Sequence, residues 1–362
     1  ILICILLVPG DDSSRGIAQV VPDSTLGSES SLVPAGAENG SLPTVLIEGG
    51  AQHNTTLFHS FEQFNVNTNQ QVRFANPVDV ENIFSRVTGD IPSNIDGLLG
   101  VDGLANLFFL NLSGVVFGEN AELDLQGAFV VTTGEHIAFP DGNTFSAISP
   151  ETAPMLTVSA PIGIQFGQAP QPIDLSNVEL QLETEQPMIL LGGDVTLNSA
   201  QVAGFGGRLV LGGLAGPGEV TLNLNATEPQ EEVTFSEGSE LAAITLLNGT
   251  EVFSSGDRGG GDIIIQGQDI TLLSSELLTP ALEPAGTEGN QPGEILLTAS
   301  GDILITEESA LENAVEAGTF SEGGDIVIQA GGNISVTEES GIEIYVAEST
   351  VGNGGNIVIQ AG

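Results

Sequence analysis

The side chains that could carry out chemistry are few, and they do not cluster in the sequence. Histidine occurs at His53, His59 and His136, and Cys4 is the only cysteine. A transition-metal site needs several His or Cys ligands close together, and the sequence offers no such group. Cys4 alone can form neither a disulfide framework nor a thiolate zinc site. His59 stands between two phenylalanines of a strand-like segment, which favours a structural role.

Paired carboxylates are the remaining catalytic candidates, at Glu307-Glu308 and Glu338-Glu339. Two carboxylates flanking a sugar bond can act as a glycosidase dyad. These pairs, however, lie 31 residues apart at matching points of a repeat, and a catalytic pair is normally single. We therefore predict solvated turns there, with no catalytic residue, no cofactor and no metal site. Loose association of Ca²⁺ with the acidic surface stays open, because carboxylates suit hard cations.

The charge balance excludes whole classes of partner. The 362 residues include 48 acidic side chains, five arginines and no lysine, for a formal net charge of −43. Such a surface repels phosphate and anionic headgroups, which argues against nucleic-acid and lipid binding. Lysine chemistry, including Schiff bases, is impossible. The hydrophobic fraction of 40% is too high for a disordered acidic tail.

An internal repeat dominates the C-terminal third. Residues 261–266 (GDIIIQ) recur at 293–298, 324–329 and 355–360, with offsets of 32, 31 and 31 residues. Two further strand-like segments repeat in phase, so each period holds three short strands separated by turns. A fixed period of this kind is typical of a solenoid. We predict an all-β chain in which each period is one coil of a parallel β-helix.

Details of that β-helix can be predicted from the repeat. Ile326 and Ile328 should point inward and stack on Ile295 and Leu297 of the preceding coil. Glycines should supply the positive φ angles of the corners. Segments 193–197, 207–211 and 218–222 look like the same strand at irregular spacing. The proline-rich stretch 150–172 predicts an excursion outside the helix or a seam between two parts.

The two ends of the sequence support further expectations. Residues 1–8 (ILICILLV) are apolar but too few to span a bilayer. With the small-x-small triplet 16–18 they resemble a secretory signal peptide that lacks its start, so residues 1–18 are interpreted as a truncated signal peptide. The sequence stops at Gly362 directly after a repeat strand. A β-helix ending there would expose an uncapped edge, so we expect the chain to be part of something longer.

Several segments between residues 19 and 170 resemble one known family. They are 54–64 (NTTLFHSFEQF), 82–89 (NIFSRVTG) and 106–118 (NLFFLNLSGVVFG). In order and spacing they are similar to the N-terminal secretion domain of the filamentous haemagglutinin family. The residues of these motifs most resemble those of cyanobacterial members. One turn departs from the family pattern: Asn-Pro-Asn-Gly reads Asn111-Leu112-Ser113-Gly114 here. A Leu-Ser pair specifies a turn less sharply than Pro-Asn.

The resemblance implies a function and a division of the chain. Such proteins are exported by two-partner secretion: an outer-membrane transporter with periplasmic adaptor domains recognises the N-terminal domain, and the chain folds outside as a right-handed, single-stranded, pectin-lyase-like β-helix. This implies a secreted or cell-surface adhesin with a glycan or protein receptor. Residues 19–170 would be the secretion domain, with small extra-helical β elements, and 171–362 an incomplete shaft of 31-residue repeats. Transporter recognition and its turn would involve Asn82, Arg86, Asn111 and Gly114.

Alternatives stay open at this point. Arg86 lies in an apolar strand, where a structural bond to a turn carbonyl or an Asp competes with direct transporter contact. The β-helix could instead belong to a polysaccharide lyase or hydrolase, for which Arg73, Arg86, Arg208 and Arg258 are the available cations. It could also be the delivery stalk of a contact-dependent toxin, whose effector would lie downstream of this sequence.

Overall fold

A computed structural model describes residues 19–34, 37–38, 43–150, 160–224, 226, 228–256, 260–280, 292–315, 323–347 and 354–362. The expected signal peptide with Cys4, and Arg258, lie outside the described residues. None of the helices in these ranges has the length and apolarity to cross a membrane. The helices are in fact a single turn each, η1 (Gly27–Glu29) and α1 (Pro229–Glu232).

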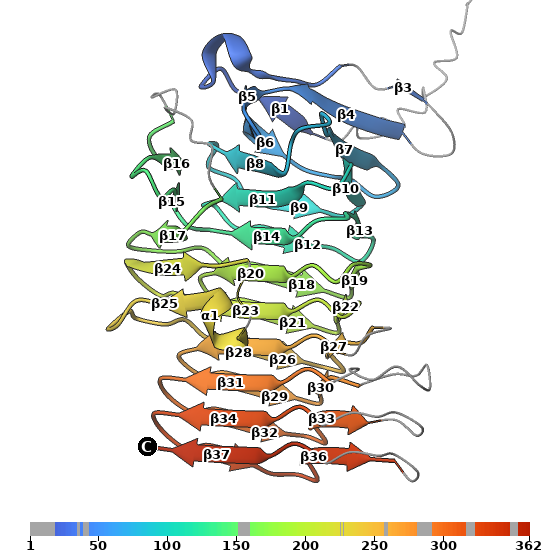
Figure 1. The fold of residues 1–362 in the computed structure, drawn as a ribbon, viewed down its shortest axis with the longest axis vertical. Coiled ribbons are helices and arrows are strands. Elements are labelled where there is room, and N and C mark those ends of the chain that lie inside the picture. Colours follow the sequence, from blue (N-terminus) through green and yellow to red (C-terminus); the bar gives the residue numbers. More distant parts are fainter. Residues whose placement is uncertain are drawn as a thin grey trace, which may run out of the picture.

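Strands dominate the described chain and stack into a three-sided prism (Figure 1). The first face is a 12-stranded sheet that runs the whole length of the stack. Its strands are β1 (Val20–Pro22), β5 (Ala51–His53), β6 (Thr56–Phe64), β8 (Asn82–Val87), β11 (Asn106–Asn111), β14 (Phe129–Thr132), β20 (Met188–Gly192), β23 (Leu209–Gly213), β28 (Ile263–Gly267), β31 (Ile295–Ala299), β34 (Ile326–Ala330) and β37 (Ile357–Ala361).

The second face is an 8-stranded parallel sheet, and the third face is split into two 6-stranded sheets. The second face holds β9 (Ser93–Ile95), β12 (Val115–Phe117), β18 (Ile173–Ser176), β21 (Val195–Asn198), β26 (Ile244–Leu247), β29 (Ile270–Leu273), β32 (Ile303–Thr306) and β35 (Ile334–Val336). The third face holds β2 (Ser31–Leu32), β3 (Ala37–Glu38), β4 (Pro43–Gly49), β7 (Gln71–Ala75), β10 (Leu98–Asp102) and β13 (Glu122–Asp124), and then β19 (Glu179–Leu182), β22 (Gln201–Gly204), β27 (Glu251–Ser254), β30 (Glu276–Leu278), β33 (Ala310–Val315) and β36 (Gly341–Val346).

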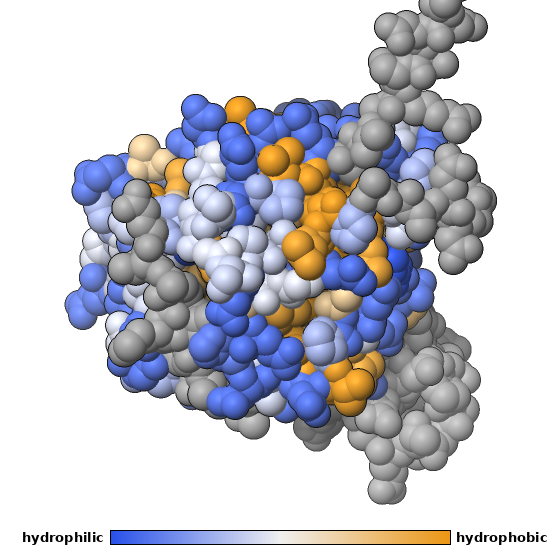
Figure 2. Space-filling model, turned by 90° about the horizontal axis from the view of Figure 1, so that it is seen from above, coloured by the Kyte–Doolittle hydropathy of each residue, from blue (hydrophilic) through white to orange (hydrophobic). Residues whose placement is uncertain are grey.

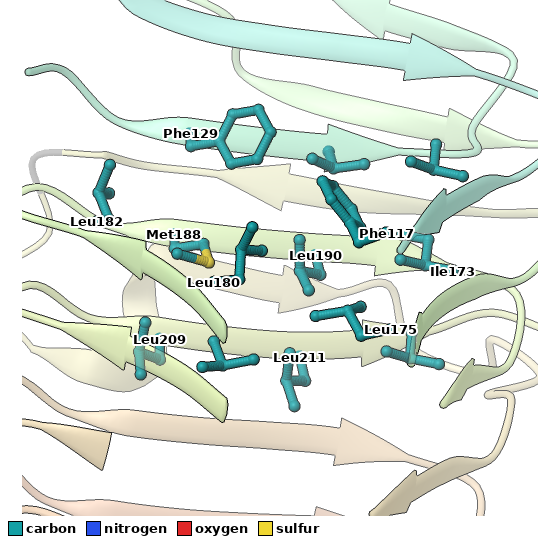
Figure 3. Close-up of a cluster of buried hydrophobic side chains, with 14 of the residues drawn as sticks. Phe117, Phe129, Ile173, Leu175, Leu180, Leu182, Met188, Leu190, Leu209 and Leu211 are labelled. Atoms are coloured by element: carbon teal, nitrogen blue, oxygen red, sulfur yellow. The ribbon is translucent and has the colours of Figure 1, made fainter. Parts of the chain in front are cut away.

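The prism is filled by inward-pointing aliphatic and aromatic side chains (Figure 3). The predicted stacking is confirmed: Ile326 pairs with Ile295 and Ile328 with Leu297, and all four are fully buried. The fold class is therefore confirmed as an all-β parallel β-helix. The expectation for the corner glycines is met only in part: Gly114, Gly206 and Gly249 have positive φ, whereas the glycines at the starts of the repeat strands do not. A Cβ on Gly293 would instead collide with the Gly261 carbonyl of the neighbouring coil, so close stacking explains these glycines.

A fifth, antiparallel sheet covers part of the outside of the first face. This outer sheet consists of β15 (His136–Ala138), β16 (Thr144–Ser146), β17 (Gly163–Phe166), β24 (Gly218–Leu222) and β25 (Val233–Phe235). It encloses a second hydrophobic core that reaches from Leu26 to Ile264. The extra-helical elements are thus confirmed, and they continue beyond the N-terminal part into residues 218–235.

Two details of the sequence interpretation are wrong. The three segments read as one repeating strand fall in different sheets: β21 lies on the second face, β23 on the first and β24 in the outer sheet. All three segments show the same alternation of apolar residues, so the sequence does not reveal which sheet each strand joins. The sequence, which intersperses Phe58, Phe61, Phe64, Phe74 and Phe84 with polar residues, predicts that all five lie in the β-helix core. Phe61, Phe64 and Phe74 do fill the prism, whereas Phe58 and Phe84 point outward into the second core.

The N-terminal end of the stack is closed by antiparallel strands. β1 and β5 both pair with β6, the first parallel strand of the first face, and β2 and β3 pair with β4 on the third face. Seen from above, this end carries a strip of hydrophobic residues among hydrophilic ones (Figure 2). Covering these strand edges satisfies peptide groups that would otherwise be open to pairing.

Candidate recognition site

Arg86 points outward from β8 into the second core, and only 1% of the residue is exposed. Its Nε donates to Ser60 Oγ (2.9 Å), Nη1 to the Ser146 carbonyl (2.5 Å), and Nη2 to Thr25 Oγ1 (2.8 Å) and the Pro150 carbonyl (3.2 Å). These partners come from the segment 20–32, here called the N-terminal cap, which holds β1, η1 and β2, from β6, and from the first hairpin of the outer sheet. Arg86 therefore fastens three distant segments to β8, and its expected bonding to turn carbonyls is confirmed.

An aspartate balances the Arg86 charge through intervening hydroxyl groups. Asp23 accepts hydrogen bonds from Ser60 Oγ (2.7 Å), Thr88 Oγ1 (2.7 Å) and Thr25 Oγ1 (2.6 Å). Burial raises the pKa of Asp23, but these hydrogen bonds outweigh burial and hold the pKa below its usual value. Burial lowers the pKa of Arg86 to about 10, against the attraction of Asp23. We call this group the Arg86 cluster, which comprises Asp23, Thr25, Ser60, Arg86 and Thr88. At neutral pH it forms an ion pair between Arg86 and Asp23 that is bridged by hydroxyl groups.

The turn that follows β11 is held by Asn111, which is fully buried. Its Nδ2 donates to Ser93 Oγ (2.9 Å) and to the Ile91 carbonyl (3.2 Å), and its Oδ1 accepts from the Ser113 N–H (2.9 Å). The Gly114 N–H closes the turn by donating to the Asn111 carbonyl (3.1 Å). Gly114 has φ +110°, a conformation that favours glycine. Asn111 and Gly114 thus supply most of the bonds and the positive φ angle of this turn, while Ser113 Oγ donates to the Gly89 carbonyl (3.3 Å) and Leu112 packs against the second core.

Asn82 lies at the opposite end of β8 from Arg86 and has a different role. Its Oδ1 accepts a hydrogen bond from Asn106 Nδ2 (2.9 Å), and Asn106 Oδ1 accepts from the Ala128 N–H (2.8 Å). This ladder ties three successive coils at one corner. The structure therefore brings Arg86 and the turn at Asn111 to the same end of the strands β8 and β11, while Asn82 stands apart.

His59 is fully buried within the N-terminal coils. Its Nδ1 lies 3.0 Å from Ser31 Oγ, and its ring centroid lies 6.1 Å from that of Phe61 and 5.3 Å from that of Phe74. Burial lowers the pKa of His59 to about 3, so the imidazole is neutral at physiological pH. These contacts confirm the structural role expected for this histidine.

Arg73 sits outside the prism on the third face. It pairs with Asp102 through Nε (2.5 Å) and with Asp124 through Nη1 (2.7 Å). Burial lowers the pKa of Arg73, but hydrogen bonds and charge from the two aspartates outweigh it and raise the pKa. Throughout the ranges that the structure describes, no group of three or more His, Cys, Asp or Glu side chains could hold a metal ion.

Arg208 anchors the second half of the outer sheet. Its Nε lies 2.8 Å from Asp262 Oδ2, and its Nη1 lies 3.5 Å from Oε2 of Glu232 in α1. Glu232 is only 1% exposed. Burial raises the pKa of Glu232 to about 7, against the opposing attraction of Arg208. The ion pair between shaft and outer sheet therefore changes charge near neutral pH.

Sequence reasoning missed most of the Arg86 cluster. Ser60 and Thr88 each lie in a segment that carries the family resemblance, yet only Arg86 was singled out. A useful signal was present, because one buried cation in a lysine-free chain requires a nearby carboxylate and hydroxyl partners. The sequence could not show which of the 48 acidic residues would supply the carboxylate.

Fold and site together define a capped β-helical module whose N-terminal end is built by the motifs at 54–64, 82–89 and 106–118. The TPS secretion domain family model matches residues 18–272. The chain therefore belongs to the TPS secretion domain family. The match continues through residue 170, where the sequence places a domain boundary, and that boundary stays a prediction. This is a family of secretion domains and not of enzymes, and its members act with a partner outer-membrane transporter in export to the cell surface or beyond it.

Solved structures similar to this chain include two secretion domains. One is the filamentous hemagglutinin secretion domain, with 16% identity, coverage of 95% of this chain and 99% of that chain, and a TM-score of 0.36. The other is the HMW1 secretion domain from Haemophilus influenzae, with 13% identity, coverage of 91% and 99%, and a TM-score of 0.45. A search of curated proteins finds no match.

Proposed function

We propose that the N-terminal part of this chain directs its export through the periplasmic adaptor domains of an outer-membrane transporter, and then nucleates the β-helix outside the cell. The single observation that carries the proposal is the Arg86 cluster. It joins the N-terminal cap, the first parallel coils and the first hairpin of the outer sheet at one buried ion pair. These segments should fold together, because separating them would leave the buried Arg86 and the half-buried Asp23 without partners.

Nucleation follows from how a solenoid is stabilised. Each coil needs a neighbour to cover its strand edges and its hydrophobic face. In the described chain β1 and β5 pair with β6, and β2 and β3 pair with β4, so these short strands cover the edges of the first coil. The N-terminal region can thus form first and serve as a template, after which each emerging coil adds its strands in register.

The turn at Asn111 is our candidate for transporter contact. The Asn111 side chain faces inward, so it acts as a positioning residue and holds the turn in shape. Leu112 and Ser113 are half-buried and form the accessible side of the turn. An adaptor domain could recognise this turn and extend a neighbouring strand edge, as in other cases of strand addition.

Beyond export, we assign the mature protein to the adhesins, with a cell-surface glycan or protein as receptor. The support is the family resemblance together with the acidic shaft, whose net charge keeps long rods soluble and separate. The described arginines Arg73, Arg86 and Arg208 are engaged with partners inside the fold. That leaves none of these three as the free cation that a polysaccharide lyase site would use.

Co-expression with the cognate transporter tests the export role. Asn111→Ala should reduce the secreted yield at least fivefold, because the turn loses the side-chain bonds that shape it. Asn198→Ala is the matched control: Asn198 also ends a strand and bonds Asn248 across coils (2.8 Å), but it lies on the shaft. Its secreted yield should stay within twofold of wild type.

Folding is checked separately by circular dichroism of each variant refolded from denaturant. If the Asn111→Ala variant refolds normally and is secreted as well as wild type, the turn has no role in recognition. Deletion of residues 44–130 gives a coarser test of the same claim. Unchanged secretion of that deletion variant would contradict the export role of the whole region.

A further inference from the structure

The N-terminal cap is fastened to β6 at a second point besides the Arg86 cluster. Ser31 of β2 is buried, and its Oγ accepts a hydrogen bond from the Ser60 N–H (3.2 Å) and lies 3.0 Å from His59 Nδ1. A hydroxyl group has one hydrogen to donate, so the Ser31 hydroxyl donates to Nδ1. This contact requires Nδ1 to be unprotonated, and the single ring hydrogen of the neutral imidazole is therefore on Nε2.

The site around the His59 ring does not suit a positive charge. The residue is fully buried, and among the described residues its Nε2 has no hydrogen-bond partner. The rings of Phe61 and Phe74 lie against it. A Cβ on Gly50 would lie 2.8 Å from His59 Cε1, so the backbone of Gly50 packs directly on the ring. An imidazolium in this place would be desolvated without a compensating partner.

The neighbouring elements supply no counter-ion for His59. Their charged or titratable side chains are exposed, paired outside the prism, in the Arg86 cluster, or, for His53 of β5, half-buried opposite Thr56. They are Asp23, Glu29, Glu48, His53, Glu62, Arg73 and Arg86. Burial is accordingly the one cause that lowers the pKa of His59 from 6.5 to about 3.

We infer that His59 is an acid-sensitive latch: the neutral imidazole holds Ser31 and with it one end of the N-terminal cap, and the protonated imidazole releases that end. Protonation changes Nδ1 from an acceptor into a donor, so the Ser31 hydroxyl loses its acceptor and a buried charge is left without a partner. Release lets water reach the imidazolium and uncovers the edge of β4 with which β2 pairs. The inference concerns closure of the cap and does not depend on the proposed contact with a transporter.

The direction of the pH effect follows from the two states of the cap. In the open cap the imidazole is hydrated and has its ordinary pKa of 6.5, whereas in the closed cap the pKa is about 3. Closure is therefore fully favoured above pH 6.5, and its equilibrium constant falls about tenfold for each pH unit below that value until about pH 3. Asp23 stays charged down to pH 4.5, because its pKa lies below the ordinary value of 3.8. Protonation of Glu232 acts in the opposite direction, since the fold favours the protonated form.

Hydrogen exchange of the full chain, read by mass spectrometry at about pH 7.5 and about pH 4.5 and corrected for the intrinsic rate at each pH, tests the latch. Peptides that contain Gly50 and Ser60 report this contact, because their N–H groups donate to the Ser30 carbonyl and to Ser31 Oγ. Their opening constant should rise about a hundredfold at the lower pH, whereas the opening constants of β31 and β34 should not rise. In His59→Asn, whose amide does not titrate and whose Oδ1 can accept from Ser31, the rise should be below about threefold.

His53→Gln is the matched control, because it removes another imidazole from the same region and should keep the hundredfold rise. If circular dichroism shows that His59→Asn is unfolded at pH 7.5, His59→Phe, which keeps an aromatic ring beside Phe61 and Phe74, replaces it with the same expectation. Three results would overturn the inference. They are a wild-type cap without the rise, a non-titrating variant that keeps the rise, and an equal rise in β31 and β34, which would show general unfolding by acid.

Discussion

The outward-facing positions of the first face change character along the molecule. One register column links Phe84, Phe108, Val130, Ile189, Val210, Ile264, Leu296 and Val327 across successive coils. The column is buried as far as Ile264, and Leu296 and Val327 are only half-buried. The outer sheet ends at the same level, so the N-terminal strands lie between two cores and the C-terminal strands border one. Strands with the same backbone pairing are therefore packed on both faces in the N-terminal part and on one face in the C-terminal part.

The largest effect is expected for Phe84→Ala. Phe84 is fully buried, and its ring centroid lies 4.5 Å from Phe108, 5.2 Å from Phe139 and 5.3 Å from Phe58. Removing it should lower the free energy of unfolding by about 4 kcal/mol, measured by urea titration with circular dichroism. A loss below about 1 kcal/mol would mean that the second core contributes little.

Arg86→Met should cost about 3 kcal/mol, because the substitution removes every hydrogen bond of the buried guanidinium and leaves the half-buried Asp23 without its cation. Arg73→Gln is the matched control in the same domain. Arg73 pairs with partly exposed aspartates, and such pairs contribute at most about 1 kcal/mol. Equal losses in the two variants, measured by the same titration, would show that the Arg86 cluster is no more than a surface ion pair.

The attachment of the outer sheet at α1 should depend on pH. The pKa of Glu232 is raised to about 7 by burial, so the fold favours its protonated form. The contribution of Glu232 to the free energy of unfolding is therefore largest below about pH 4.5, and it is lost as the pH rises from about 4.5 to about 7. Glu232→Gln stays neutral, so this variant should exceed wild type by about 2 kcal/mol at pH 8 and match it at pH 4. A difference independent of pH would contradict this titration.

The sharpest matched pair is Val210→Ala and Val327→Ala, which are valines of the same register column. Val210 is 1% exposed beneath the outer sheet, and Val327 lies on the single-core side. We expect losses of about 2 kcal/mol for Val210 and below about 1 kcal/mol for Val327, from urea titrations of both variants. Equal losses would remove the distinction between the two regions.

The same contrast explains what the sequence could predict. The single-core coils alternate regularly, so the repeat at 293–298 and 324–329 predicted both the β-helix and the stacking of Ile326 on Ile295. In the two-core region both faces are apolar and the alternation disappears. Phe58 and Phe84 could not be told from prism residues there, and β24 in the outer sheet looked like β21.

The site was predictable only in its parts. Arg86 stood out as a cation in an apolar strand, and the Asn111 turn stood out through its motif. Their partners depend on tertiary folding, because Asp23 and Ser146 lie some 60 residues from Arg86 on either side. No local sequence pattern predicts contacts between residues so far apart in the chain.

Native-state hydrogen exchange most directly tests whether the N-terminal region is the stable nucleus of this fold. Amide protons of β8, β11 and β14 should show the highest opening free energies, and those of β31 should be lower by about 2 kcal/mol or more because β31 borders one core. Uniform protection from β8 to β31, or stronger protection in β31, would contradict the nucleation role of the capped, two-core region.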